Sequence, residues 1–386
     1  MNLISRHINA ELIGLLKNNP VTALIGPRQC GKSTLAKKII ADMENVIYLD
    51  LERPSDLAKL NDAEWFFSSQ KDKMFCIDEV QRKPELFPLI RSLVDEWGEN
   101  QKIFILGSAS RELLKQSSES LAGRISYIRL TPFLWKEISK QFTIEQYMLN
   151  GGFPKSILAN SQEVSLRWRE DFISTFLERD LLQWSGFSPV TMHRLWQMLA
   201  HLNGQTVNYS QLSKSLGVSN VTVRNYIDLL KGTFMVEVLP PYISNMGKRL
   251  VKAPKVYIAD SGLTNALLNI ESFQQLTGNP VFGSIWEQLV LSNLTGHFHS
   301  AKFFFYRTSA GSEIDIVMKY KSKIFAIESK ATLSPVLSKG NYNAIQDINP
   351  DYTFVVTPAK KAWPLKNGID VVSLDGLIEN INEQIS

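Results

Sequence analysis

The chain has 386 residues, of which 44% are hydrophobic and 21% are charged. These fractions exclude a disordered or fibrous protein, and the length predicts about two to three domains. No apolar run approaches the roughly 18 residues of a membrane span, residues 1–11 contain no secretory signal pattern, and two cysteines exclude a disulfide scaffold. The formal net charge of +4 is too small to indicate nucleic acid by itself. We therefore expect a soluble, cytoplasmic protein without membrane association.

The first part of the chain alternates strand-like and helix-like patterns. Short apolar runs between breaking residues predict strands at residues 21–25, 46–51, 74–77, 102–106 and 125–130. Amphipathic segments at residues 33–41 and 86–97 predict helices. Apolar strands that alternate with helices predict a parallel sheet covered on both faces. We assign this α/β domain to residues 1–140.

A glycine-containing loop follows the first predicted strand. Residues 26–33 match G-x-x-x-x-G-K-[ST] between a strand and a helix, which is the context that this motif requires. The glycines let backbone N–H groups point at a phosphate, and the helix N-terminus adds partial positive charge. Lys32 would reach the β- and γ-phosphates and Ser33 would ligate Mg²⁺, so the predicted cofactors are ATP and Mg²⁺. The predicted nucleotide-binding residues are Gly26, Pro27, Arg28, Gln29, Cys30, Gly31, Lys32, Ser33 and Thr34.

Polar residues near the later strands complete this predicted site. Asp78 ends an apolar strand and would bind Mg²⁺, whereas Glu79 would orient or activate the attacking water. Ser108 follows the strand at residues 102–106 and either senses the γ-phosphate or belongs to a plain turn. Arg124 either stabilises phosphate charge, as an arginine finger in cis or in trans, or forms a surface salt bridge. A finger in trans would require a homo-oligomer.

Five short motifs follow one another along the chain. They are GPRQ at residues 26–29, IDEVQ at 77–81, GSAS at 107–110, LAGR at 121–124 and GGFP at 151–154. In this order they resemble a prokaryotic family of AAA-type P-loop ATPases that carries a C-terminal domain of unknown function, and the resemblance covers nearly the whole chain. It implies a five-stranded ATPase core followed by a winged helix, without a settled biological role.

The middle of the chain, residues 141–258, is expected to be mainly helical. Apolar residues recur at helical spacing in residues 165–184 and 191–202, and residues 209–216 and 219–230 predict a helix-turn-helix. Ser219 would cap the second of its helices. Strands at residues 234–239 and 255–258 would form a wing. The predicted packed seam contains Leu212, Leu216, Val221, Tyr226, Leu229 and Leu230.

The helix-turn-helix segment is also basic. Between His201 and Val256, seven Lys or Arg residues, Lys255 among them, are opposed only by Asp228 and Glu237, which leaves a net charge of +5. Such a segment is typical of proteins that contact phosphates, so the predicted partner is nucleic acid, with DNA preferred. A winged helix that serves as a lid or a protein contact is the alternative. The predicted contact residues are Asn220, Thr222, Arg224, Lys248 and Arg249.

The remaining residues, 259–386, predict a third domain of mixed α/β character. A helix around residues 284–294 precedes strands at residues 303–306, 314–318, 324–329 and 353–356. Glu328 and Lys330 face the same side of one strand, and a hairpin would bring Asp315 beside them. Two carboxylates and a lysine suit a Mg²⁺ site whose lysine orients the attacking water. Simple cross-strand charge pairs are the alternative.

This arrangement resembles the restriction-endonuclease-like, or PD-(D/E)XK, nucleases. Asp315 matches the motif aspartate, residues 328–330 match E-x-K, and Glu287 matches a carboxylate that these nucleases often carry on the first helix. Ile314 replaces the proline of the motif name. The resemblance implies that Glu287, Asp315 and Glu328 bind metal and that Glu328 and Lys330 are catalytic. Two hypotheses follow: an ATPase that acts on nucleic acid with a metal-dependent nuclease domain, or a nucleotide-driven switch whose C-terminal domain binds a partner without cleavage.

Overall fold

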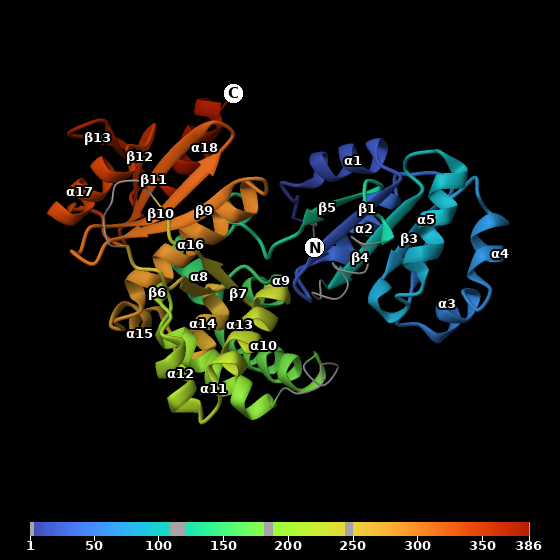
Figure 1. Ribbon diagram of the computed structural model, residues 1–386, viewed down its shortest axis with the longest axis horizontal. Coiled ribbons are helices and arrows are strands. Elements are labelled where there is room, and N and C mark those ends of the chain that lie inside the picture. Colours follow the sequence, from blue (N-terminus) through green and yellow to red (C-terminus); the bar gives the residue numbers. More distant parts are fainter. Residues whose placement is uncertain (1–3, 109–119, 181–187, 244–249, 386) are drawn as a thin grey trace. The chain divides into compact units, whose positions relative to one another are not determined.

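The computed structural model describes residues 4–108, 120–180, 188–243 and 250–385 (Figure 1). The chain divides into two compact units. The first comprises Met1–Phe133 with Gly232–Phe234, and the second comprises Leu134–Lys231 with Met235–Ser386. Among the described helices, none has both the length and the apolar character needed to cross a membrane.

A five-stranded sheet forms the centre of the first unit. Its strand order is β2-β3-β4-β1-β5, and every neighbouring pair is parallel. The strands are β1 (Val21–Gly26), β2 (Val46–Asp50), β3 (Met74–Asp78), β4 (Ile103–Ser108) and β5 (Ile125–Arg129). The predicted parallel α/β core is therefore confirmed. Because all strands run the same way, the loops after β1, β3 and β4 meet at one edge of the sheet.

Helices cover both faces of this sheet. Successive residues of β1 alternate between the two cores, since Ala23 packs with Phe75 and Ile90 whereas Leu24 packs with Leu12 and Phe104. The side chains on both faces of the sheet are therefore buried and apolar, which explains why these strands have continuous apolar sequences. The helices are α1 (Asn9–Asn18), α2 (Lys32–Ile40), α3 (Pro54–Lys59), α4 (Ala63–Ser68) and α5 (Leu86–Trp97).

The second unit begins with a helical part built around the buried Trp196. Its helices are α7 (Trp135–Ile138), α8 (Ile144–Asn150), α9 (Pro154–Ile157), α10 (Gln162–Thr175), α11 (Pro189–His201), α12 (Tyr209–Leu216), α13 (Asn220–Gly232) and α14 (Ser261–Leu267). A three-stranded antiparallel sheet, β6-β8-β7, packs against the same core. It consists of β6 (Gln205–Thr206), β7 (Val236–Leu239) and β8 (Lys255–Ile258).

One residue of the predicted seam lies elsewhere. Val221 is exposed, and Val223 is buried in its place. The buried positions of α13 are Val223, Tyr226, Ile227, Leu229 and Leu230, which follow the three- and four-residue spacing of one helix face. Val221 lies outside this stripe, so the expectation that it packs in the seam is corrected.

A six-stranded mixed sheet forms the C-terminal part of the second unit. Its order is β13-β14-β12-β11-β10-β9, with β11, β12 and β14 parallel and the other neighbours antiparallel. The strands are β9 (Lys302–Arg307), β10 (Glu313–Tyr320), β11 (Lys323–Ser329), β12 (Tyr352–Val356), β13 (Trp363–Leu365) and β14 (Ile369–Val372). The helices here are α15 (Phe273–Thr277), α16 (Phe282–His297), α17 (Lys339–Ile348) and α18 (Leu374–Ile385).

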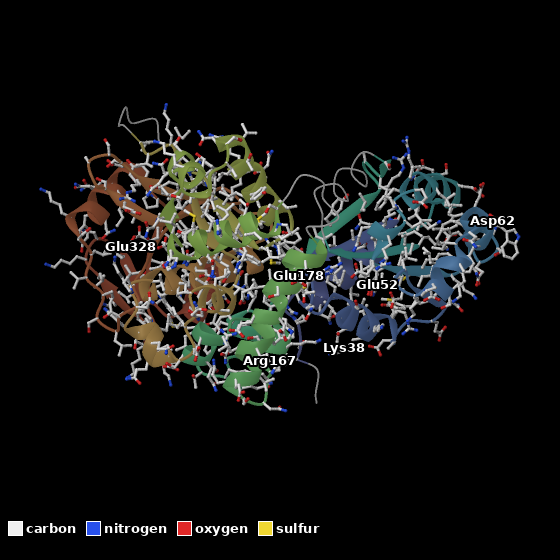
Figure 2. The ribbon with its side chains drawn as sticks, turned by 90° about the horizontal axis from the view of Figure 1, so that it is seen from below. Lys38, Glu52, Asp62, Arg167, Glu178 and Glu328 are labelled. Carbon is white, nitrogen blue, oxygen red and sulfur yellow. The ribbon has the colours of Figure 1, made fainter. Side chains whose placement is uncertain are left out.

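Two features of this sheet position side chains. The β10–β11 hairpin that the sequence predicts is present, with Ile316 opposite Ile327. Trp286 of α16 is buried, and its indole N–H donates to the carbonyl of Val356 at 2.9 Å. This hydrogen bond ties α16 to the end of β12, where Val356 pairs with Ser329 at the end of β11. Figure 2 shows the side chains of the molecule, with Glu328 labelled on β11 and Lys38 on α2.

Candidate functional site

The phosphate loop, residues 26–33, connects β1 to α2 at the carboxyl edge of the parallel sheet. A Cβ at Gly26 would lie 2.1 Å from the carbonyl oxygen of Leu130, so only glycine fits there. Gln29 and Gly31 have φ angles of 60° and 104°, which curl the backbone of the loop. No side chain caps the start of α2. The first N–H groups of this helix are therefore oriented for an anion such as a phosphate.

Lys32 lies across the loop that it ends. It is only 5% exposed, and its ammonium donates to the carbonyl oxygens of Gly26 at 3.0 Å and Pro27 at 2.8 Å. Ser33 is half-buried and Thr34 is exposed at the start of α2. The ammonium is thus held at the loop and needs only to exchange carbonyl partners to meet a phosphate.

Arg6 supports the loop from the other side, a role that sequence analysis missed. It is 7% exposed and donates to the carbonyl oxygen of Cys30 at 3.0 Å and to that of Thr131. Its guanidinium carbon lies 4.7 Å from the centre of the Phe133 ring. No motif marks such a residue, because it lies outside the loop in sequence and reaches it only in the folded unit.

Asp78 and Glu79 follow β3 at the same edge of the sheet. Asp78 is buried, and its carboxylate accepts the Tyr48 hydroxyl and the N–H of Glu79, the latter at 3.0 Å. Glu79 has a φ of 56°, a conformation that non-glycine residues adopt mainly at constrained sites. Burial raises the pKa of the Glu79 carboxyl, and the positive charge of Lys32 partly opposes that shift. Gln81 also donates to Glu79.

Ser108 lies at the carboxyl ends of the strands of this sheet, and Arg124 lies at their amino ends. The backbone of Ser108 pairs with Gly26 at the loop edge, and its side chain lies outside the described residues. Arg124 precedes β5, its carbonyl accepts the N–H of Val21 at 3.2 Å, and its guanidinium donates to the Asp95 carboxylate at 2.8 Å. A five-residue strand spans roughly 16 Å, which separates Arg124 from its own phosphate loop. The expectation of an arginine finger in cis is therefore corrected.

The predicted nucleic-acid contacts on α13 have different surroundings. Asn220 and Arg224 are exposed, and the Arg224 guanidinium lies 4.5 Å from the centre of the Tyr209 ring. Thr222 is half-buried because its N–H and hydroxyl contact the Ser219 hydroxyl at 3.0 Å and 2.9 Å. Ser219 thus caps α13 as predicted, and Asn220 and Arg224 are exposed at the start of this helix.

The basic segment is smaller than its sequence suggests. Lys248 and Arg249 lie outside the described residues. Lys255 is only 2% exposed and pairs with carboxylates inside the second unit. The expectation that Lys255 adds to a basic face is therefore corrected, because its charge is neutralised internally.

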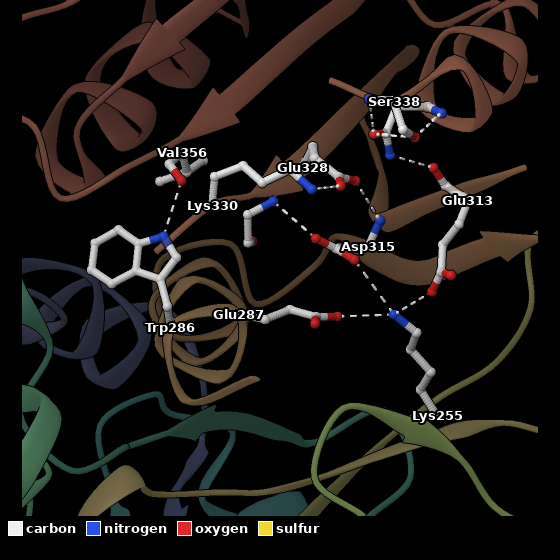
Figure 3. A network of polar contacts seen from close by, with 11 residues as sticks. Lys255, Trp286, Glu287, Glu313, Asp315, Glu328, Lys330, Ser338 and Val356 are labelled. Carbon is white, nitrogen blue, oxygen red and sulfur yellow. Dashed lines mark hydrogen bonds and ion pairs between the residues drawn. The ribbon is translucent and has the colours of Figure 1, made fainter. Parts of the chain in front are cut away.

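A second candidate site lies in the second unit, in a cavity of about 500 Å³ (Figure 3). We call it the acidic pocket; Glu287, Asp315, Glu328 and Lys330 all line it. The N–H of Asp315 donates to Glu328 at 3.3 Å, and the N–H of Ser329 donates to Asp315 at 2.9 Å. Lys330 donates to Glu328 at 2.7 Å. The hairpin and α16 thus bring together the residues that the sequence singled out.

Lys255 enters this pocket from β8, which sequence analysis missed. Its Nζ lies 3.0 Å from Glu287, 3.0 Å from Glu313 and 3.5 Å from Asp315 (Figure 3). Tyr257 lies two residues further on the same strand and donates to Glu287. The alternation of β8 was available from sequence, but the acidic partners of Lys255 come from more distant segments and were not.

Burial and mutual repulsion alter the protonation of this pocket. Burial, together with the charge of Asp315, raises the pKa of Glu287 to about 7 and that of Glu328 to about 8, although Lys330 opposes the second shift. Burial alone would lower the pKa of Lys255, but the carboxylates around it, above all Glu287, raise it well above its usual value. Lys255 therefore stays charged while Glu287 titrates near neutral pH.

Comparisons with known proteins divide the chain into three matched parts. Family models match residues 18–139 as an AAA domain, residues 141–274 as a domain of unknown function (DUF8612), and residues 282–377 as a domain of unknown function (DUF4143). The AAA match agrees with the ATPase family that the motifs resemble.

Relatives and solved structures that match longer stretches of the chain were also found. The uncharacterized protein Rv2008c of Mycobacterium tuberculosis is 36% identical over 374 residues, which cover 97% of this chain and 84% of that protein. An uncharacterized protein of Haemophilus influenzae is 27% identical, over 66% of this chain and 70% of that protein. The solved Walker-type ATPase PABY2304 of Pyrococcus abyssi is 16% identical with a TM-score of 0.48, over 69% of this chain and 96% of that chain.

Proposed function

Because this chain belongs to the family of the uncharacterized protein Rv2008c of Mycobacterium tuberculosis and carries an AAA domain, we propose that it is a Mg²⁺-dependent ATPase that acts on nucleic acid. The observation that supports the ATPase most directly is the convergence of Lys32, Asp78 and Glu79 at one edge of the parallel sheet. Ligands of open α/β sheets bind at this edge.

The residues of this edge fit a Mg²⁺–nucleotide. Ser33 and Asp78 would hold the metal, because hydroxyl and carboxylate oxygens are its preferred ligands. Bound Mg²⁺ neutralises charge on the β- and γ-phosphate oxygens. Lys32 would transfer its hydrogen bonds from the carbonyls of Gly26 and Pro27 to phosphate oxygens. Glu79 would orient the attacking water, and its raised pKa favours proton acceptance nearer neutral pH.

Two substitutions test this site. Lys32→Ala should weaken ATP binding at least about tenfold, because the ammonium is the cation held at the loop. Glu79→Gln should bind ATP within about twofold of wild type and lose about a hundredfold or more in turnover, because only the catalytic base is removed. Calorimetry and steady-state hydrolysis measure the two effects.

The exposed residues Lys38 and Glu52 (Figure 2) give matched controls, Lys38→Ala and Glu52→Gln. Wild-type turnover in both test variants would contradict the ATPase assignment.

The start of α13 supports the nucleic-acid part of the proposal. Asn220, Val221 and Arg224 are exposed there, on a helix that follows α12 across a short turn. Polar, apolar and basic groups on the first turns of such a helix suit base edges, thymine methyl groups and phosphates. We propose that α12, α13 and the β6-β8-β7 sheet form a winged helix that binds DNA. The three predicted domains, residues 1–140, 141–258 and 259–386, remain part of this proposal.

Arg224 provides the test of DNA binding. Arg224→Ala should weaken binding of a labelled duplex and reduce the salt dependence of log Kd by about one unit of slope, as expected for one lost phosphate contact. Fluorescence anisotropy at several salt concentrations measures both. Arg167→Ala removes the same charge from an exposed site on α10 and should change neither quantity (Figure 2). Equal behaviour of the two variants would favour a lid or protein contact.

A nuclease is the second candidate, and the meeting of Glu287, Asp315, Glu328 and Lys330 in one pocket favours it. Incubation of the protein with labelled duplex and single-stranded DNA in Mg²⁺ or Mn²⁺, with and without ATP, tests it. Cleavage that Glu328→Ala abolishes would establish the activity. Intact ATP hydrolysis without cleavage would favour a nucleotide-driven switch whose C-terminal part binds a partner.

A further inference from the structure

Lys255 occupies the centre of the acidic pocket. Its ammonium lies within 3.5 Å of three carboxylates, those of Glu287, Glu313 and Asp315. A buried carboxylate requires a compensating charge, and this ammonium supplies it to Glu287 and Asp315. The more exposed Glu313 also pairs with Arg307, at 3.4 Å. The chain therefore supplies its own cation at the place where the endonuclease resemblance implies a divalent metal.

Five of the six carboxylate oxygens that would bind such a metal are already engaged by groups of the chain itself. Asp315 contacts Lys255 with Oδ1 and accepts the N–H of Ser329 with Oδ2. Glu328 contacts Lys330 with Oε1 and accepts the N–H of Asp315 with Oε2. Glu287 accepts from both Lys255 and Tyr257 with Oε1. Within the described part of the chain, no group of three or more potential ligands is arranged to hold a metal ion, so the residues as arranged do not fit the implied metal.

The position of Lys255 is built into the fold. Lys255 and Tyr257 project from the same side of β8, which is paired on both edges, by β6 and by β7. Both residues are at most 2% exposed, and the Lys255 ammonium also lies 5.7 Å from the centre of the Phe305 ring. Gly204 leaves room for this arrangement, because a Cβ there would lie 3.2 Å from Tyr257 and 3.4 Å from Glu287.

We infer that Lys255 is the resident cation of the acidic pocket and excludes divalent metals from it, so that replacing Lys255 by a neutral residue converts the pocket into a metal site. The inference rests on the second candidate function only for the identity of the implied metal. According to this inference, a residue of β8, a strand of the proposed winged helix, controls the charge of the acidic pocket.

Mn²⁺ binding to the full chain tests this inference. The experiment uses an Asp78→Asn background without nucleotide, so that the ATP site does not contribute, and isothermal calorimetry at pH 8. Lys255→Met keeps the length of the side chain and removes its charge. We expect it to bind one Mn²⁺ per chain at concentrations where the Lys255 parent binds none, which corresponds to at least about a tenfold difference in Kd. The added substitution Asp315→Asn should abolish that binding.

Lys330→Met is the matched control, since Lys330 contacts Glu328 alone among the pocket carboxylates by hydrogen bond and is partly exposed. It should bind Mn²⁺ no more tightly than the parent. The inference is overturned if the parent itself binds one Mn²⁺ that Asp315→Asn removes, or if folded Lys255→Met binds none. Should Lys255→Met fail to fold by circular dichroism, Lys255→Gln replaces it, and the measurement on the parent still decides.

DNA cleavage separates this inference from the proposed nuclease. Mn²⁺ binding by Lys255→Met without cleavage would support the resident cation and count against the nuclease. Cleavage by wild type through a metal that Asp315→Asn removes would establish the nuclease and overturn the resident cation. The two ideas therefore predict different results, and the failure of one can be distinguished from the failure of the other.

Discussion

Lys255 illustrates how a single buried charge changes the chemistry of a site. With Lys255 and Lys330 protonated, the carboxylates of Glu287, Asp315 and Glu328 share two internal cations. Five of their six oxygens accept hydrogen bonds or ion pairs from the chain itself, which lowers the cost of burying them. Even so, burial and mutual repulsion keep Glu287 and Glu328 protonated at higher pH than usual.

Glu328 therefore makes stability depend on pH. Its pKa rises from 4.5 to about 8 on folding, since burial and Asp315 disfavour the charged form. Between these pH values the unfolded chain releases the proton that the folded chain retains, so the free energy of unfolding falls as pH rises through this window. The glutamine of Glu328→Gln does not titrate, so this variant lacks that loss. When the pH is raised from 5.5 to 8.5, the free energy of unfolding of the variant relative to that of wild type should therefore increase by at least about 1 kcal/mol. Denaturant titration at both pH values measures this difference.

Glu163→Gln, at an exposed position on α10, serves as the control and should leave the pH dependence unchanged. Because the pocket carboxylates interact, the gain belongs to the group and not to Glu328 alone. Parallel curves for wild type and Glu328→Gln across this pH range would show that the carboxyl is not perturbed.

At the scale of elements, the GGFP motif at residues 151–154 acts as a structural joint between helices. Asp260 caps α14 by accepting the N–H of Leu263 at 3.1 Å, and it also accepts the N–H of Gly152 at 2.7 Å. The buried Arg169 donates to the carbonyl oxygens of Leu149 and Gly262 at 2.9 Å and 3.1 Å. These contacts fasten the end of α8 to the start of α14, more than a hundred residues apart in sequence.

Gly151→Ala should disrupt this joint. Gly151 has a φ of 70°, and an added Cβ would lie 2.0 Å from a carboxylate oxygen of Asp260. Left-handed strain and the clash together should lower the free energy of unfolding by about 2 kcal/mol or more. Denaturant titration measures the loss. Gly283→Ala on α16 meets no atom within 4 Å and should remain within about 0.5 kcal/mol of wild type; equal stability of the two variants would contradict the close packing of Gly151.

At the scale of the whole molecule, the question is whether ATP hydrolysis needs more than one chain. Arg124 lies at the amino ends of the strands, whereas the phosphate loop lies at their carboxyl ends. It would therefore contact a nucleotide only if that nucleotide were bound to another copy of the chain. Its guanidinium instead contacts Asp95 with two nitrogens and Ala122 with a third. This geometry favours the surface salt bridge over the arginine finger.

Arg124→Ala should therefore keep its turnover within about twofold of wild type at every protein concentration, because a partly exposed salt bridge contributes little to the active site. Steady-state hydrolysis over a hundredfold range of protein concentration measures this. The sharper comparison mixes Arg124→Ala with Lys32→Ala. If each is inactive alone and the mixture recovers turnover, Arg124 acts in trans and the salt-bridge assignment is wrong.

The sequence by itself determined the elements whose causes are local. The phosphate loop needs a strand, glycines and a helix start within a dozen residues, so its motif and its context are visible together. The strands of the parallel sheet are buried on both faces and therefore appear as continuous apolar runs. The hairpin that brings Asp315 beside Glu328 was predictable for the same reason, because its two strands and its turn are adjacent in the chain.

Tertiary structure alone decided which distant groups meet. Arg6 reaches Cys30, Tyr48 reaches Asp78, and Lys255 reaches Glu287, and in none of these pairs are the partners adjacent in sequence. The sequence predicted Lys255 to be part of a basic surface, because the net charge of a segment does not show which side chains point into the interior. Burial depends on the packing of separate strands, which no local pattern specifies. For that reason the acidic residues of the pocket could be found from sequence, whereas the cation that neutralises them could not.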